Sequence, residues 1–372
     1  MDTKMKRVVV ATFMGHFVDD GLVLMLPLLI PFIARDFNLS YTQIGIFGGS
    51  LVLTLGFGQI LAGYVSDFYK VKWPFISFGL AILSLSLFAM SFCSSYSCLI
   101  MWNLLAGFGA SFYHPCGIAL LVKSMKEKIR GRILGIHGVG GGTGILFYPV
   151  CAGIILNKWG WHEVLLILPL TGLVSSALFF FVKEDHSSHA GRKRFPLIQK
   201  DSLLMCALFG CFAMFFRGFV TFLPVQLEEI GFSTVSVTGA ITLFYATGVV
   251  AELLAGILTD IYSRKKIVLI SMLAASVLVL VLFHSVWVFI IPLGFVAYVV
   301  WVPATVVYVE GIPEAWYATA LGMVQGVAGL LAASSPVIMG LIAERSGVST
   351  SFIFLSAVGV AGAVVALKLN TR

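Results

Sequence analysis

The chain has 372 residues, of which 59% are hydrophobic and only 11% are charged. An average soluble domain carries about 25% charged residues, so this composition excludes a soluble globular protein and places the chain in a lipid bilayer. The formal net charge is +7. The distribution of the basic residues, described below, accounts for that charge without a nucleic-acid partner.

Apolar runs of about 20 residues, the length that crosses a membrane as a helix, follow one another along the whole chain. We therefore expect an all-α polytopic membrane protein with twelve spanning helices. The predicted spans are residues 8–34, 41–66, 73–92, 96–121, 131–157, 163–182, 201–227, 235–259, 267–284, 286–309, 316–343 and 349–368.

One polar stretch, residues 183–200, is much longer than the other predicted loops and falls between the sixth and seventh spans. It indicates a link between two halves. We predict an N-terminal six-helix bundle in residues 1–182, a cytoplasmic linker in 183–200 and a C-terminal six-helix bundle in 201–372.

The basic residues predict the orientation of the chain. Twenty lysines and arginines fall on one side, and only Arg35, Lys158 and Arg345 fall on the other. Positively charged loops stay in the cytoplasm, so we expect both termini to be cytoplasmic and the protein to span the plasma membrane. On the outer side, Cys93 and Cys98 flank the loop after the third span and could pair, although their spacing indicates neither a disulfide framework nor a zinc site.

Two patterns occur twice. Gly63 and Asp67 end one apolar run, and Gly256 and Asp260 end another, 193 positions later. At a shift of 187, five positions of the first half match the second: Gly135 with Gly322, Gly142 with Gly329, Pro149 with Pro336, Gly153 with Gly340, and Gly160 with Gly347. Glycine and proline mark backbone geometry, so the halves are expected to share a shape. Duplicated bundles with a site between them are typical of transporters that alternate access.

The few ionisable residues within the predicted spans are candidate functional residues, because an unpaired charge in hydrocarbon is costly. His16 and Asp20 are four residues apart and share one helix face. We predict that Asp20 carries a coupled proton, while a purely structural hydrogen-bonded cluster remains the alternative. The candidates for proton coupling are Asp20, His16, Asp19 and Glu252, and those for substrate binding are Arg217, His114 and His137.

The segment from Gly256 to Lys266, with Asp260 and Arg264 at its motif positions, resembles the loop signature of the major facilitator superfamily. The first copy of the pattern is degenerate. An aspartate at a helix C-terminus opposes the helix dipole, so its occurrence in both copies indicates another partner. The predicted gating residues are Gly63, Asp67, Gly256, Asp260 and Arg264.

The glycine-rich segment 138–144 lies inside an apolar span and lacks the Gly-Lys-Ser/Thr ending of a phosphate loop. Small residues spaced by four let helices approach closely in lipid, so we predict helix packing here. Together with Pro149, these glycines partly resemble the fifth-helix motif that is typical of antiporters in the superfamily.

Nearly the whole chain shows a closer resemblance, to the fosmidomycin-resistance family of drug exporters. The matching segments are His16-x-x-Asp19-Asp20, Leu26-Pro27-Leu28-Leu29, Gln43-Ile44-Gly45, Gly63-Tyr64-x-x-Asp67, Trp73, Gly107-x-Gly109-x-Ser111-x-x-His114-Pro115, Val139-Gly140-Gly141, Val307-Tyr308-x-Glu310 and Gly340-Leu341-Ile342-Ala343. The resemblance implies a proton-driven exporter of small molecules. The chain departs from the pattern at Asp19, where the family usually has asparagine, and at Asn103, where many superfamily antiporters have arginine.

The resemblance also implies two six-helix bundles around a cavity lined by helices one, four, seven and ten. There a carboxylate would bind and release a proton and Arg217 would hold an anion. Aromatic side chains that would hold an apolar body include Tyr113, Tyr298 and Trp301. Family geometry implies two contacts that close the cytoplasmic side: Asp67 with the eleventh helix near residues 315–319, and Asp260 with the fifth helix near Arg130 and Arg132.

We therefore predict a monomeric secondary active transporter, without cofactor or metal, that exports a small amphiphilic or anionic organic compound in exchange for protons, as in drug efflux and resistance. Uptake or exchange of an endogenous organic acid is the alternative. A remote alternative is an intramembrane metalloenzyme that uses the histidines and aspartates of the spans. The duplication argues against an enzyme, because a catalytic site does not need two equivalent rocking halves.

Overall fold

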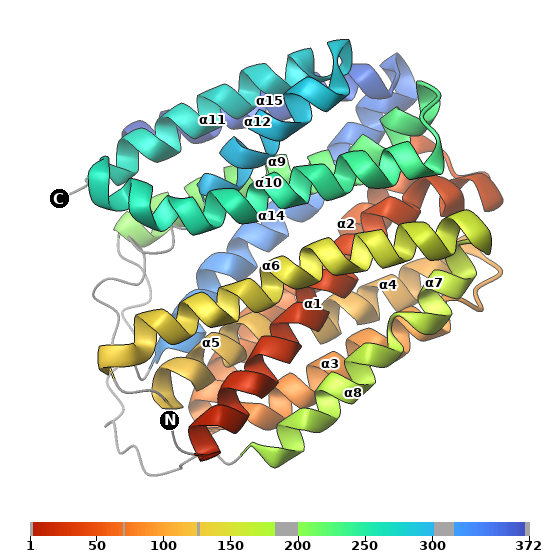
Figure 1. Cartoon of the computed structure of the whole chain (residues 1–372). Helices are drawn as coiled ribbons and strands as arrows, with labels where there is room; N and C mark the ends of the chain where they lie inside the picture. The colour runs from red at the N-terminus through yellow and green to blue at the C-terminus, as the bar shows by residue number, and fades with distance from the viewer. Residues whose placement is uncertain (1–2, 70, 125–126, 183–199, 301–315, 369–372) are drawn as a thin grey trace. The chain divides into compact units, whose positions relative to one another are not determined.

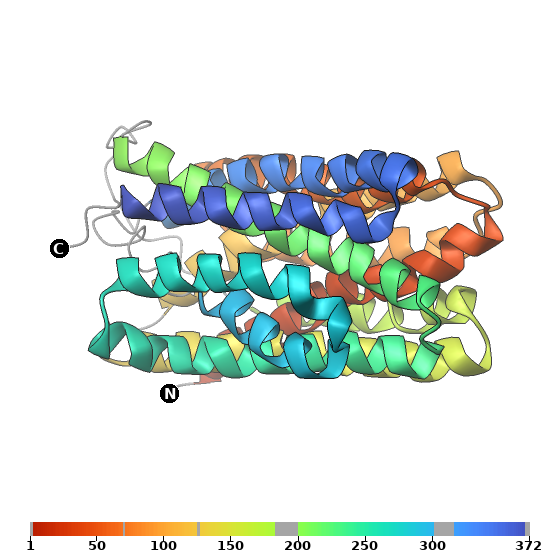
Figure 2. The ribbon, with the colours of Figure 1, turned by 90° about the horizontal axis from the view of Figure 1, so that it is seen from above.

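The computed structural model describes residues 3–69, 71–124, 127–182, 200–300 and 316–368, and within these ranges every regular element is a helix (Figure 1). The predicted all-α fold is confirmed. Figure 2 shows the helices of the second half running alongside one another.

The described part of the first half contains eight α-helices and one short 3-10 helix. They are α1 (Thr3–Asp36), α2 (Tyr41–Tyr69), α3 (Trp73–Met90), α4 (Tyr96–Ala110), α5 (Tyr113–Ser124), α6 (Glu127–Lys158), α7 (Trp161–Ile167), α8 (Leu170–Leu178) and η1 (Phe179–Phe181).

The described part of the second half is also entirely helical. Its elements are α9 (Lys200–Glu229), α10 (Thr234–Ile261), α11 (Arg264–Val281), η2 (Leu282–His284), α12 (Val286–Val299), α14 (Tyr317–Ser346) and α15 (Val348–Leu367).

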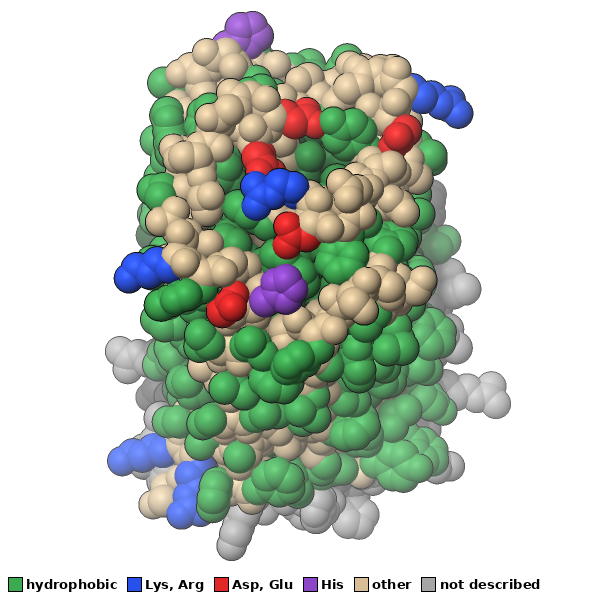
Figure 3. All heavy atoms as spheres, turned by 90° about the vertical axis from the view of Figure 1, so that its right-hand side faces the viewer, with side chains coloured by type: hydrophobic (Ala, Val, Ile, Leu, Met, Phe, Trp, Pro, Cys, Tyr) green, Lys and Arg blue, Asp and Glu red, His purple; other side chains and the backbone are tan. Residues whose placement is uncertain are grey.

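Eleven helical segments in the described ranges are long and apolar enough to cross a membrane. The predicted tenth span, 286–309, is represented by the shorter apolar helix α12, and residues 301–309 of that span lie outside the described residues. Large apolar side chains on these helices are exposed, for example Phe78 at 57% and Phe180 at 68%. Figure 3 shows hydrophobic side chains over much of one face. Such surfaces are suited to lipid rather than water.

The duplicated glycines and prolines occupy matching positions in the helices. Gly160 precedes α7 with φ 120° and Gly347 precedes α15 with φ 83°, conformations that favour glycine. Pro149 lies inside α6 and Pro336 inside α14. The repeat read from the sequence therefore corresponds to a repeat of local backbone shape.

The fourth predicted span is broken into α4 and α5 at residues 111–112. Pro115 falls in the first turn of α5, where its missing N–H group removes no intrahelical hydrogen bond. Because of this break, Tyr113 and His114 are the first two residues of a new helix. The break therefore positions two side chains of the candidate site.

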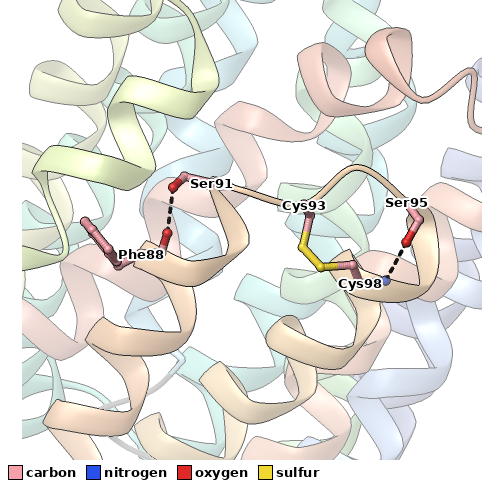
Figure 4. Close-up of a disulfide and its surroundings, with 5 residues drawn as sticks. All are labelled: Phe88, Ser91, Cys93, Ser95 and Cys98. Atoms are coloured by element: carbon pink, nitrogen blue, oxygen red, sulfur yellow. Dashed lines mark hydrogen bonds between the residues drawn. A yellow bond between two sulfur atoms is a disulfide. The ribbon is translucent and has the colours of Figure 1, made fainter.

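The described loop between α3 and α4 is closed by a disulfide. The sulfur atoms of Cys93 and Cys98 are bonded at 2.13 Å, with the two Cα atoms 5.6 Å apart (Figure 4). In the same loop Ser95 caps α4, because its Oγ accepts a hydrogen bond from the backbone N–H of Cys98 at 3.3 Å. The pairing that the sequence left open is thus present.

The chain divides into two compact units. The first contains residues 1–26, 50–197 and 311–327, and the second contains 27–49, 198–310 and 328–372. In the first unit α3 packs against α4 and α8, and in the second α10 packs against α12 while α15 packs against α9 and α11. The predicted halves, 1–182 and 201–372, stay a prediction.

Candidate functional site

Six polar side chains from three helices gather within the first unit. We call this group the His–Asp cluster: His16, Asp19 and Asp20 from α1, Tyr113 and His114 from α5, and His137 from α6. The sequence prediction named all six, but placed them in three separate spans. The structure brings them together.

Asp20 lies between two imidazole rings. Its Oδ2 is 3.0 Å from Nε2 of His16, and its Oδ1 is 2.9 Å from Nε2 of His114. Oδ2 of Asp19 lies 3.7 Å from the same nitrogen of His114. The side chains of His16, Asp20 and His114 are 12%, 20% and 22% exposed, so the carboxylate of Asp20 is largely but not completely shielded.

The hydrogen bonds of His16 define where a proton must be. Its Nδ1 lies 2.8 Å from the backbone carbonyl of His137, which can only accept, so Nδ1 donates. Its Nε2 faces the carboxylate of Asp20 at 3.0 Å, and a hydrogen bond there needs a second proton. That proton resides either on Nε2 of His16 or on Asp20. A hydrogen bond within the pair would therefore hold one proton that either group could carry.

Tyr113 and His137 lie behind His16. The hydroxyl of Tyr113 donates to the carbonyl of Thr12, so Nε2 of His137 is the donor in its 3.0 Å contact with that hydroxyl. Tyr113 is 1% exposed and His137 is 5% exposed. The rings of His16 and His137 stack with centroids 4.2 Å apart. Both residues were predicted as substrate contacts, and that role stays a prediction.

The glycine-rich part of α6 packs closely on α1, as the sequence predicted. A Cβ atom added to Gly140 would lie 2.7 Å from the carbonyl oxygen of Phe13, and one added to Gly144 would lie 2.0 Å from that of Phe17. Only glycine permits this approach of two helix backbones.

The second unit holds the remaining substrate-binding candidates. The guanidinium carbon of Arg217 lies 5.9 Å from the ring centroid of Phe216, which in turn contacts Tyr298 edge-on at 5.3 Å. Phe216 thus contacts both Arg217 and Tyr298, and Tyr298 is buried. Glu252, on α10, is partly exposed. Trp301 lies outside the described residues.

Asp67 has partners on two sides within the first unit. Its Oδ2 accepts hydrogen bonds of 2.8 Å from both the backbone N–H and the hydroxyl of Thr319, in the first turn of α14. Its Oδ1 lies 2.7 Å from Nζ of Lys72, which also donates to the carbonyl of Ser66 at 2.6 Å. The contact near residues 315–319 that family geometry implied is therefore formed.

The two gating patterns differ in their surroundings. A Cβ added to Gly63 would lie 2.3 Å from the carbonyl oxygen of Ala318, whereas one added to Gly256 meets no atom within 4 Å. Arg264 is the first residue of α11. The side chains of Asp260, Arg130 and Arg132 lie outside the described residues, so their predicted contact stays a prediction.

The N-terminal end of α2 belongs to the second unit, and the sequence did not predict its partners there. The backbone N–H of Thr42 donates to Glu344 at 3.1 Å, and the hydroxyl of Tyr41 donates to Glu229. Glutamates at helix ends gave no signal of such contacts.

One group of potential metal ligands occurs in the described part of the chain. Ligand atoms of His16, Asp20 and His114 all lie within 4.8 Å of one another. The same atoms contact one another directly, because Asp20 lies 3.0 Å from His16 and 2.9 Å from His114, and the expectation of a site without a metal stays a prediction.

Comparison with known proteins gives a consistent picture. A family model described as Major Facilitator Superfamily matches residues 11–243 and 205–372. The cis,cis-muconate transport protein of Acinetobacter baylyi is 23% identical over 97% of this chain and 93% of its own length. The fosmidomycin resistance protein of Escherichia coli is 20% identical over 91% and 86%. A probable nitrate transporter of Staphylococcus epidermidis is 22% identical over 92% and 91%.

Solved structures show the same fold. A bacterial homolog of the human lysosomal transporter Spinster, in an inward-facing conformation, matches with a TM-score of 0.78 and 14% identity over 98% of this chain and 97% of its own. The human organic anion transporter MFSD10 matches with a TM-score of 0.75 and 14% identity over 98% and 100%.

Proposed function

The chain belongs to the Major Facilitator Superfamily, and from that premise we propose that it exports a small organic anion in exchange for protons. Family membership and the transporter relatives make it a membrane transporter. This replaces the alternative of an intramembrane metalloenzyme. The coupling ion, the direction and the substrate class are the proposed parts.

The observation that carries proton coupling is the position of Asp20 between His16 and His114. Ionisable residues within membrane spans mark proton relays and substrate paths. The contact between His16 and Asp20 holds a proton that either group can carry, and the partial exposure of both lets a proton or a substrate reach them. Occupation of His114 or His16 by an anionic substrate would compete with Asp20 for the same ring nitrogens. Substrate and proton would then use the site in turn.

An anionic substrate is supported by two observations. Two relatives are transporters named for cis,cis-muconate and for nitrate, and one protein of the same fold is an organic anion transporter. In this chain Arg217 offers a cation beside the ring of Phe216, and such a pair of a cation and an apolar ring suits an anion with an apolar body. Export is favoured by the fosmidomycin resistance relative. Uptake of an organic acid is the second candidate, favoured by the muconate transport relative.

We further propose that both termini are cytoplasmic and that the protein acts as a monomer in the plasma membrane. The predicted outer side carries three basic residues against twenty on the inner side. The disulfide between Cys93 and Cys98 lies in a loop of the predicted outer side. Disulfides persist in oxidising compartments, so its presence supports this orientation.

Purified protein in liposomes with an imposed pH gradient tests the proposal. The probes are cis,cis-muconate, nitrate and fosmidomycin, with the neutral dimethyl ester of muconate as a control. We expect an anion to accumulate on the side of lower pH, the outside of the cell, against its own gradient. We expect Asp20→Asn to abolish this accumulation while binding of the anion remains measurable.

Accumulation by Asp20→Asn equal to that of the unmodified protein would overturn proton coupling at this residue. Anion transport that is the same with and without the pH gradient would overturn proton coupling altogether. Movement of the anion together with protons would favour the uptake of an organic acid over export.

A further inference from the structure

Helix α6 touches His16 at two points that are one helical turn apart. The carbonyl of His137 accepts the hydrogen bond from Nδ1 at 2.8 Å. Four residues later the backbone of Gly141 lies against the ring itself. A Cβ atom at Gly141 would lie 2.5 Å from Cε1 of His16, 2.6 Å from its Nε2 and 2.9 Å from Oδ2 of Asp20.

These distances leave no room for any side chain at Gly141. Contacts of a Cβ below 3.0 Å essentially never occur, so even alanine would displace the imidazole, the carboxylate or the helix. Other glycines of α6 differ. Gly140 and Gly144 face the backbone of α1, while a Cβ at Gly135 or Gly138 would meet nothing within 4 Å. Gly141 is therefore distinguished by its contact with the His16–Asp20 pair.

A hydrogen-bonded chain ties α6 to α1 behind the pair. The hydroxyl of Tyr113 connects the ring of His137 to the carbonyl of Thr12. The side chain of His137 is thus fixed to α1, and its backbone carbonyl fixes His16. Any shift of α6 along α1 changes both the hydrogen bond to Nδ1 and the contact with Gly141.

We propose that α6 positions the proton site, with the carbonyl of His137 setting the orientation of the His16 ring and Gly141 setting its separation from Asp20. This inference rests on the proposed proton coupling and names the element that links it to conformational change. The titratable groups that face the pair are Asp19 on α1, Tyr113 and His114 on α5, and His137 on α6. If proton affinity depends on the position of α6, then protonation must in turn bias that position, because coupling free energies are reciprocal.

Infrared difference spectroscopy of the purified protein in lipid tests the proposal without a substrate. The reporter is the carbonyl stretch of a protonated carboxyl group that titrates in the unmodified protein and is missing in Asp20→Asn. We expect Gly141→Ala to shift the midpoint of this titration by about 0.5 pH unit or more, a roughly threefold change in proton affinity. The matched control is Gly138→Ala, the same change on the same helix where nothing lies within 4 Å. It should leave the midpoint unchanged.

A second variant covers the case in which Gly141→Ala does not fold. Tyr113→Phe removes the hydroxyl that ties His137 to α1 and adds no atom, so it should also shift the midpoint. The control is Tyr148→Phe. Tyr148 is also on α6, but its hydroxyl bonds to Thr171 on α8, so this change should leave the midpoint unchanged.

The outcomes separate the two proposals. If no titrating band depends on Asp20, the proposed proton coupling fails. If the band titrates with the same midpoint in Gly141→Ala as in Gly138→Ala, the proposed role of α6 is wrong and proton coupling stands. Where Gly141→Ala does not fold, the same midpoint in Tyr113→Phe as in Tyr148→Phe leads to that conclusion.

Discussion

Among single residues, Asp67 shows how a membrane protein holds a charge at a helix end. Its carboxylate accepts from the first turn of α14, where unpaired N–H groups and the helix dipole favour a negative charge. Its other oxygen pairs with Lys72, and both side chains are only 5% exposed. Asp67 lies at the C-terminal end of α2, where the helix dipole disfavours a carboxylate, and its partner on α14 explains why it is placed there.

Asp67 and Lys72 should be strongly coupled in unfolding experiments. Asp67→Asn leaves the buried ammonium of Lys72 without its carboxylate, and breaking such a pair costs about 3–5 kcal/mol. Lys72→Met should cost less, because Thr319 still donates to Asp67. The free energy of unfolding of each variant and of the double variant in detergent measures this. We expect the double variant to lose clearly less than the sum of the two, and strict additivity would contradict the pairing.

The sequence predicted the residues of the His–Asp cluster but only part of their roles. The rarity of charge within apolar spans singled out His16, Asp20, His114 and His137. It could not predict that His137 acts on His16 through its backbone carbonyl, because a backbone contact leaves no mark on residue type. Lys72 was overlooked as a partner of Asp67, although the shift of 193 positions that matches Asp67 with Asp260 also matches Lys72 with Lys265.

Among the helices, hydropathy predicted the spans well and their internal breaks poorly. The span predicted at 96–121 is two helices, and the span predicted at 163–182 is α7, α8 and the short 3-10 helix η1. Hydropathy is insensitive to such breaks, because both sides remain apolar. The local signals were Pro115 and Pro169, which lie at or next to the breaks.

The paired glycines of the repeat should respond in opposite ways to alanine. A Cβ at Gly63 or Gly322 would lie 2.3 Å from a backbone carbonyl, so alanine there should cost about 1–3 kcal/mol of stability. Their counterparts Gly256 and Gly135 have nothing within 4 Å, so alanine there should stabilise the helix by about 0.5–1 kcal/mol. Thermal unfolding of the four variants tests this, and each counterpart is the control for its pair. Equal losses at paired positions would refute the difference in environment.

Over the whole molecule, the distribution of basic residues predicts which loops face the cytoplasm. Ten of the twenty basic residues on the predicted inner side lie in residues 123–132 and 183–200. Single cysteines placed there, in a variant that keeps only the Cys93–Cys98 pair, should resist membrane-impermeant thiol reagents on intact cells. Asn157→Cys, at the exposed end of α6 on the predicted outer side, should react rapidly. Rapid labelling of the basic loops would contradict the predicted orientation.

The open surroundings of Gly256 and Gly135 have a consequence for the working cycle. Inside a helix, glycine is less stable than alanine by about 0.5–1 kcal/mol, and among the described residues neither Gly256 nor Gly135 has a neighbour that requires the smaller side chain. Their counterparts in the repeat, Gly63 and Gly322, do have such neighbours. Glycine at these two positions lowers helix stability without making a close contact in this conformation. The loss is explained if the close contact forms in another conformation of the transporter. We therefore expect these two glycines to mark surfaces that meet another helix only when the transporter changes conformation. Alanine at Gly256 or Gly135 would then give a protein that folds more stably and transports more slowly.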